Sequence, residues 1–118
     1  MTSFNEFESI PATGNTWLLN DVLRKQWGFN GFVVSDFTAI AEMVNHGIGN
    51  SQEVGVKALK AGVDMDMIAD CYHAVLKKSL EEGKITEAEI DSACRRILIA
   101  KYQLGLFHDP YKYCNPKR

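Results

Sequence analysis

The segment from Gly31 to Asp36, "GFVVSD", carries a continuous apolar run straight into a serine and an aspartate. A run that is apolar throughout, rather than alternating, is typical of a parallel strand covered on both faces. Strand-like stretches also occur at residues 1–5 and 63–67, and helical patterns lie between and after the three stretches. Such an alternation predicts βαβ units with parallel strands near residues 1–5, 31–35 and 63–67. The fold class is therefore expected to be α/β.

The helical patterns are recognised by the spacing of their apolar residues and by a glycine that follows each of them. These glycines are Gly28, Gly47, Gly62, Gly83 and Gly105. Thr38 and Ser51 are predicted helix N-caps, and Thr86 with Glu89 forms a predicted capping box. Cys94 lies in the apolar stripe of the last helix and is predicted to be a core residue.

Three strands make a poor free-standing parallel sheet, because both edges would be bare and apolar. The 118 residues correspond to one domain or to a piece of one. The simplest interpretation is the C-terminal part of a larger α/β barrel or doubly wound domain, and a compact independent fold is the alternative. The turn-rich tail at residues 108–118 is predicted to be a linker.

Composition excludes several classes of function. Hydrophobic residues make up 46% and charged residues 24% of the chain, and the formal net charge is −2. Because no basic block is present, we expect neither nucleic acid nor a membrane surface as a partner. The apolar runs are too short to span a bilayer, and the first ten residues do not have the pattern of a signal peptide. Three cysteines without a C-x-x-C pair predict neither a disulfide framework nor a zinc site. Cys71-Tyr72-His73 is not expected to bind a metal, because no nearby residues complete a set of four ligands. We expect no cofactor.

Candidate polar groups follow each predicted strand. They are Phe4-Asn5-Glu6, Ser35-Asp36, and Asp64 with Asp66. In α/β barrels the C-terminal ends of the strands carry the chemistry, because the loops there converge over one mouth. Asp36 is either a cap of the following helix or a catalytic carboxylate, and the pattern alone favours neither. Alternation in "VDMDM" puts Asp64 and Asp66 on one face of a strand, where structural support is favoured over catalysis.

Several motifs occur together and in a fixed order. "IPATGN", "WLL", "DVLR", "QWGF" and "GFVVSD" are followed by "ALKAGVDMDM", "GKITEAEID" and "LGLFHDPY". In this order they resemble the family 3 glycoside hydrolases, the β-glucosidase group. The resemblance extends from Met1 to about Tyr113. It implies that residues 1–107 are the C-terminal part of a TIM-like (β/α)8 barrel, with about three βα units, and that residues 108–118 begin a linker to a second domain.

The resemblance also implies roles for individual residues. The aspartate of the "VVSD" motif is the catalytic nucleophile of the family, which here is Asp36, and the expected reaction is retaining hydrolysis through a covalent glycosyl-enzyme. Phe37 stands where the family commonly has a tryptophan in the wall of the sugar subsite. Phe4 and Asn5, in "TSFN", resemble a position where some members contact the bound sugar. The implied substrate is a β-linked oligosaccharide or an aryl or alkyl glycoside.

The acid/base partner of the nucleophile lies in a second domain in much of the family and on a barrel loop in some members. Within this sequence, Glu6 and Glu8 are the candidate replacements, and both are interpreted as ordinary loop residues. His46, His73 and His108 are interpreted as surface or helix-end residues. We therefore expect the rest of the barrel and the second domain to be the partners of this chain, and the isolated chain to be inactive. A β-N-acetylhexosaminidase of the same family and a non-catalytic sugar-binding or interaction module are the alternatives. Many relatives are periplasmic or secreted, but the sequence leaves the compartment open.

Overall fold

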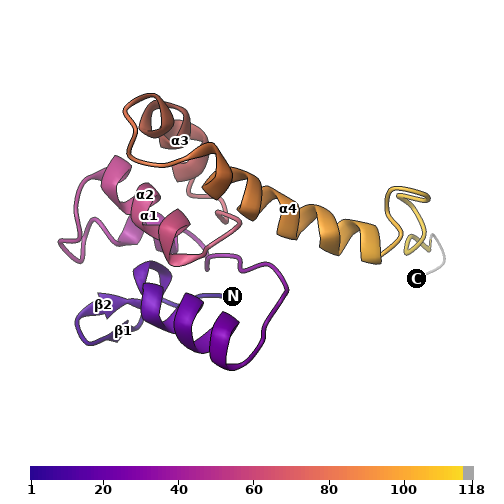
Figure 1. The fold of residues 1–118 in the computed structure, drawn as a ribbon, viewed down its shortest axis with the longest axis horizontal. Coiled ribbons are helices and arrows are strands. Elements are labelled where there is room, and N and C mark those ends of the chain that lie inside the picture. Colours follow the sequence, from indigo (N-terminus) through magenta and orange to yellow (C-terminus); the bar gives the residue numbers. More distant parts are fainter. Residues whose placement is uncertain (116–118) are drawn as a thin grey trace.

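The chain forms a helix-rich α/β structure, seen here in a computed structural model that describes residues 1–115 (Figure 1). The last three residues of the predicted linker, 116–118, lie outside the described residues. The elements in chain order are β1 (Glu6–Phe7), β2 (Ile10–Pro11), η1 (Ala12–Gly14), η2 (Trp17–Gln26), α1 (Ala39–Glu42), α2 (Ser51–Ala61), α3 (Cys71–Glu81) and α4 (Glu87–Gln103).

The regular strands form an antiparallel hairpin, in which Glu6 lies opposite Pro11 and Phe7 opposite Ile10. The two turn residues, Glu8 and Ser9, have positive φ angles of 52° and 61°, as a tight hairpin turn requires. A regular strand at residues 1–5 is not confirmed, and the first regular strand begins at Glu6 and pairs antiparallel with β2. The chain leaves the N-terminal segment through this hairpin and enters η1.

The three predicted strand segments nevertheless lie side by side. Val34 and Met65 form a single parallel bridge, and the amide of Ser35 donates to the carbonyl oxygen of Met65 at 2.9 Å. On the other side, the amide of Thr2 donates to the carbonyl oxygen of Val34 at 2.9 Å. Regular parallel strands over residues 31–35 and 63–67 are not confirmed, since within the described residues the pairing is one bridge long. A pairing of one bridge is shorter than the strands of a regular sheet, which are usually at least about three residues long.

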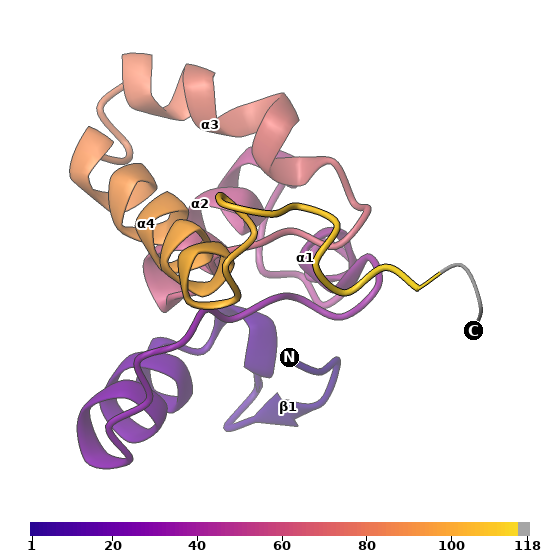
Figure 2. The same cartoon turned by 90° about the vertical axis from the view of Figure 1, so that its right-hand side faces the viewer.

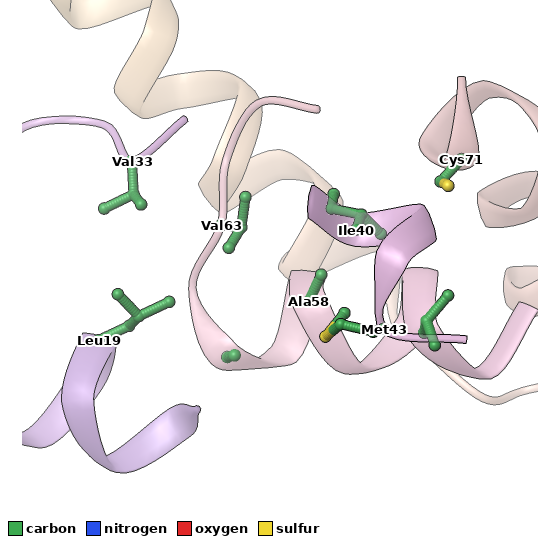
Figure 3. Close-up of a cluster of buried hydrophobic side chains, with 9 residues drawn as sticks. Leu19, Val33, Ile40, Met43, Ala58, Val63 and Cys71 are labelled. Atoms are coloured by element: carbon green, nitrogen blue, oxygen red, sulfur yellow. The ribbon is translucent and has the colours of Figure 1, made fainter. Parts of the chain in front are cut away.

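The main core lies between η2, α1, α2 and the paired segments (Figure 3). It comprises Leu19, Val33, Ile40, Met43, Val54, Ala58, Ala61, Val63 and Cys71. A second cluster of Leu59, Ile85 and Ala93 joins α2 to α4. Helix α2 contributes to both clusters, so it connects the two halves of the molecule. Full burial of one such aliphatic side chain is worth roughly 1.5–3 kcal/mol.

Two of the predicted helix starts differ from the structure. Asn50, and not Ser51, caps α2, since its side chain accepts from the amides of Gln52 and Glu53 while Glu53 bonds back to the Asn50 amide. Thr38 precedes α1 in a left-handed conformation with φ of 57°, so its hydroxyl caps nothing. The capping box of Thr86 and Glu89 at α4 is confirmed.

The prediction that Cys94 is a core residue is wrong. Cys94 is exposed, and its neighbour Ala93 is the buried residue of α4, with 6% exposure. Ile90, Ala93 and Ile97 lie three to four residues apart, so they share the face that turns toward α2 and α3, whereas Cys94 lies one residue, about 100° of helix rotation, away from Ala93.

Helix α4 extends away from the rest of the molecule (Figure 1). The radius of gyration is 15.4 Å, compared with about 13.5 Å expected for a compact domain of this length. Within the described residues of α4, none after Ala93 is buried. The view in Figure 2 looks at the same molecule from the side to which α4 points, with α3 above and the hairpin below. No helix in residues 1–115 combines the length and the apolar character needed to cross a membrane.

Candidate active site

Asp36 follows immediately after Ser35, whose amide bonds to Met65 in the 63–67 segment. The side chain is half-buried, and its Oδ1 accepts a 2.7 Å hydrogen bond from the amide of Phe37. The carbonyl oxygen of Asp36 accepts from the amide of Ala39 at 3.1 Å, which closes the turn into α1. The side chain therefore does not cap α1 by the usual bond to the N2 or N3 amide.

The predicted sugar-binding residues are all accessible. Phe37 is 57% exposed and Phe4 is 39% exposed, and Asn5 is exposed as well. The carbonyl oxygen of Asn5 accepts from the amide of Ala12 at 2.9 Å, so its backbone belongs to the hairpin. The bond from Thr2 to Val34 places the segment of Phe4 and Asn5 beside the segment of Asp36. Among the described residues, no hydrogen bond or ring contact joins Phe4 or Asn5 to Asp36 or Phe37.

Asp64 holds the segment next to Asp36 in place. Its side chain is 1% exposed, and its two oxygens lie 2.7 Å from Arg24 and 2.7 Å from Arg96. The amide of Val33 also donates to Asp64 at 2.8 Å. Burial lowers the pKa of Arg24, while the Asp64 carboxylate acts in the opposite direction. The preference for structural support at Asp64 is thus confirmed, because both of its oxygens are engaged inside the protein.

Asp66 supports the start of α3. Its Oδ2 accepts from the amides of Cys71 at 2.7 Å and Tyr72 at 3.2 Å, where a helix leaves its first N–H groups free. Its Oδ1 is buried and has no hydrogen-bond partner among the described residues. Burial does not repeat along this segment, since Val63 is buried but Met65 is 45% exposed. The prediction that Asp64 and Asp66 share one strand face stays a prediction.

Two groups beside Asp66 are held in their neutral forms. Burial raises the pKa of the Tyr72 phenol, with the charges of Asp66 and Asp64 acting in the same direction, and its hydroxyl donates to the carbonyl oxygen of Val63 at 2.6 Å. Burial and then the charges of Asp66 and Asp70 raise the pKa of the Cys71 thiol. Tyr72 lines an open pocket of about 520 Å³, together with Asp64, Asp66 and Ile97, and Cys71 lies next to it. Asp36 does not line this pocket.

Glu6 and His46 form a contact that no local sequence pattern predicts. Glu6 Oε1 lies 2.6 Å from His46 Nδ1, and the two residues are 40 apart in the chain. The pair joins the hairpin to the segment that follows α1. His73 lies 3.3 Å from Asp70 on the surface, and His108 is exposed. In residues 1–115, no group of three or more histidine, cysteine or carboxylate side chains is arranged to hold a metal ion.

The residues that the sequence missed are those whose partners are distant. Arg24 and Arg96 meet Asp64 across 40 and 32 residues. The hydroxyl of Ser35, which is fully buried, accepts a hydrogen bond from the amide of Met67. No local spacing encodes these pairs. Asn50 is the exception, because Asn50-Ser51-Gln52-Glu53 is itself a capping-box pattern.

Comparison with known proteins places the chain in a family. A family model described as the glycosyl hydrolase family 3 N terminal domain matches residues 1–100. A periplasmic beta-glucosidase of Salmonella typhimurium is 48% identical over 118 residues, and the match covers 99% of this chain and 15% of that protein. A beta-xylosidase of Formosa agariphila is 40% identical, and the match covers 91% of this chain and 16% of that protein.

Solved structures agree with the sequence matches. The crystal structure of a beta-glucosidase from Listeria innocua in complex with gluconolactone superposes with a TM-score of 0.95 and 46% identity, over 98% of this chain and 16% of that chain. The chain therefore spans about one sixth of the length of the relatives that it matches. Its α/β fold is that of a partial TIM-like barrel, and the chain belongs to glycosyl hydrolase family 3, within the N-terminal domain of that family.

Proposed function

We propose that this chain is part of a retaining β-glycosidase and that Asp36 is the nucleophile. The observation that carries the proposal is the position of Asp36, which is half-buried directly after the segment that pairs with residues 63–67. Its Oδ1 accepts from the Phe37 amide, whereas no described residue donates a hydrogen bond to its Oδ2. A carboxylate fixed through one oxygen can use the other to attack the anomeric carbon of a sugar.

The proposed reaction has two steps. Asp36 attacks the anomeric carbon while a second carboxyl group protonates the leaving oxygen, and water then hydrolyses the glycosyl-enzyme. Retaining enzymes keep these two carboxyl groups about 5–5.5 Å apart. Asp64 and Asp66 are engaged with Arg24, Arg96 and the start of α3, so neither is a good acid/base. Glu6 Oε1 is paired with His46.

The acid/base is therefore assigned to a part of the parent protein outside this sequence. Residues 1–107 are proposed to be the barrel part and residues 108–118 the start of a linker to a second domain. It follows that the isolated chain should be inactive. The proposed partners are the remaining barrel strands and that second domain.

The proposed substrate is a β-linked oligosaccharide or an aryl or alkyl glycoside. The relatives are named as beta-glucosidases and beta-xylosidases, so β-glucosides and β-xylosides are the two candidates. Phe37, Phe4 and Asn5 are proposed sugar contacts, since all three are exposed and lie on two neighbouring segments that the Thr2–Val34 bond joins. Comparing kcat/KM on the p-nitrophenyl β-glucoside and β-xyloside of the parent enzyme decides between the two sugars.

The first prediction is that Asp36 forms the covalent intermediate in the parent enzyme. A 2-deoxy-2-fluoro glycoside inactivator should attach to the peptide that contains Asp36, as read by peptide mass spectrometry. Asp36→Asn should lower kcat by roughly 10⁴-fold or more, the scale on which loss of a catalytic nucleophile is measured. Asp21→Asn, a partly exposed carboxylate paired with Lys25 on the surface, is the matched control and should keep full activity. An adduct on Glu6, Asp64 or Asp66 would overturn the assignment.

A further inference from the structure

The hydroxyl of Ser35 occupies the place of a backbone acceptor. In a regular parallel ladder, a residue bonds to the neighbouring strand through both its amide and its carbonyl group. The Ser35 amide follows this rule and donates to the carbonyl oxygen of Met65 at 2.9 Å. In a parallel ladder the amide of Met67, two residues after Met65, would donate to the Ser35 carbonyl oxygen. It donates instead to Ser35 Oγ at 2.8 Å. The side chain thus takes the bond that the Ser35 carbonyl oxygen would otherwise accept.

Met67 is bonded on both sides of the Asp36-Phe37 dipeptide. Its amide bonds to Ser35, the residue before the dipeptide, and its carbonyl oxygen accepts from the amide of Thr38, the residue after it, at 3.2 Å. Thr38 has a left-handed φ of 57°, and α1 begins at the next residue. The two residues between these bonds are released from the ladder, and Asp36 is one of them.

Ser35 is also shielded from solvent. Its exposed fraction is 0%, so water cannot replace the hydroxyl as an acceptor for the Met67 amide. A buried amide without an acceptor is unfavourable, because nothing replaces the hydrogen bond that it makes to water in the unfolded chain. If the hydroxyl is removed, the amide can regain an acceptor by drawing in the Ser35 carbonyl group. That movement pulls the backbone of Asp36 into the ladder and displaces its carboxylate.

We propose that Ser35 is a positioning residue, whose hydroxyl ends the parallel pairing one residue before Asp36 and so fixes where the carboxylate leaves the sheet. The inference rests on the proposed role of Asp36 as nucleophile and adds the element that places it. Ser35 itself touches no substrate in this scheme. Its contribution is to the rate of attack and not to the affinity for the sugar.

The test uses the parent enzyme with Ser35→Ala and a matched control, Ser79→Ala. Ser79 is likewise 0% exposed, and its hydroxyl donates to Val75 and accepts from Gln52, but it lies on α3. The readouts are the rate constant for trapping by the 2-deoxy-2-fluoro glycoside, expressed per titratable active site, and the inhibition constant of a sugar lactone. Counting active sites removes the contribution of misfolded enzyme.

Ser35→Ala should slow trapping by roughly 10–100-fold, the loss expected for a displacement of about 1 Å. The lactone inhibition constant should change less than about threefold, and Ser79→Ala should leave both values near those of the unmodified enzyme. Ser35→Cys keeps a side chain of similar size but offers only a weak acceptor, so it should also slow trapping. It replaces Ser35→Ala in the test if Ser35→Ala does not fold. Ser35→Thr keeps the hydroxyl and should restore most of the rate.

Two results would overturn the inference. One is trapping of Ser35→Ala and Ser35→Cys at the unmodified rate, and the other is an equal loss in Ser79→Ala. Asp36→Asn in the same series separates the two proposals. If Asp36→Asn is still trapped, the proposed nucleophile is wrong; if it is not trapped while the Ser35 variants react normally, only the positioning role is wrong.

Discussion

The hydroxyl of Tyr72 donates to the carbonyl oxygen of Val63 deep beside Asp64, whereas the other tyrosines, Tyr102, Tyr111 and Tyr113, are between 63% and 75% exposed. Tyr72 is therefore the tyrosine of the described residues whose side chain lies inside the protein. Burial disfavours the phenolate, and two aspartates add to the effect, so the pKa of Tyr72 is raised above its ordinary value of 10.0. The raised pKa links folding to alkaline pH.

Stability should consequently fall at high pH through Tyr72. Above about pH 10 the unfolded chain loses the phenolic proton and the folded chain keeps it, so the unfolded state binds fewer protons and the free energy of unfolding decreases. Below about pH 10 the contribution is fully present. Urea unfolding across this range should give a flatter pH dependence for Tyr72→Phe, although this variant loses roughly 1 kcal/mol at neutral pH with its hydrogen bond. Tyr111→Phe is the control, and equal slopes for Tyr72→Phe and the unmodified chain would contradict the prediction.

At the scale of elements, α2 is the helix on which the others are assembled, and its contact with α3 is unusually close. A Cβ built on Gly55 of α2 would lie 2.7 Å from Cγ2 of Val75 in α3. Val75 is β-branched and 9% exposed, so its methyl group has little freedom to move aside. The absence of a side chain at Gly55 is thus what allows the two helices to approach.

Gly55→Ala should destabilise the chain even though alanine is the better helix former. The gain in helix propensity is about 1 kcal/mol, and overpacking costs about 1–3 kcal/mol, so we expect a net loss of roughly 1 kcal/mol in the free energy of urea unfolding. In a Val75→Ala background the clash is gone, and Gly55→Ala should then be neutral or stabilising. Additive effects in this double-mutant cycle would rule out the contact as the cause.

Local signals predicted the helices well and the sheet poorly. The glycine after α2, Gly62, has a φ of 105°, and the Thr86 capping box starts α4 where the sequence placed it. The strands failed because a parallel ladder depends on neighbours far away in the chain. The position of Asp36 was predictable from the run before it, but the acceptor role of Ser35 was not, since it depends on Met67, 32 residues further on.

The molecule as a whole is an open piece rather than a closed barrel. Helix α4 projects from the body, and its outer part carries Leu98, Ile99 and Tyr102 at 44%, 45% and 73% exposure. Apolar side chains exposed in this number are typical of a surface that contacts other protein. About five sixths of the relatives' length lies outside this sequence. We propose that the rest of the family 3 domain packs against this surface of α4.

The isolated chain should therefore lack glycosidase activity. General acid catalysis contributes roughly 10²–10⁴-fold, and the proposed acid lies elsewhere in the parent protein. An activated aryl glycoside needs no acid, so p-nitrophenyl β-glucoside is the sensitive substrate. Its hydrolysis by the purified chain should not exceed that by the Asp36→Asn chain. A clear excess would mean that a second carboxylate, most simply Glu6, lies within reach of the sugar.

The placement of Asp64 has a consequence for synthesis on the ribosome. Arg24, Val33 and Asp64 emerge before Arg96, so the nascent chain carries Asp64 with one of its two arginines until α4 follows. A buried carboxylate with incomplete pairing is costly, which keeps the 63–67 segment from settling early. Arrival of Arg96 completes the neutralisation and joins η2 to α4 through the side chain of Asp64. We therefore expect the 63–67 segment to become native only after α4 has been synthesised.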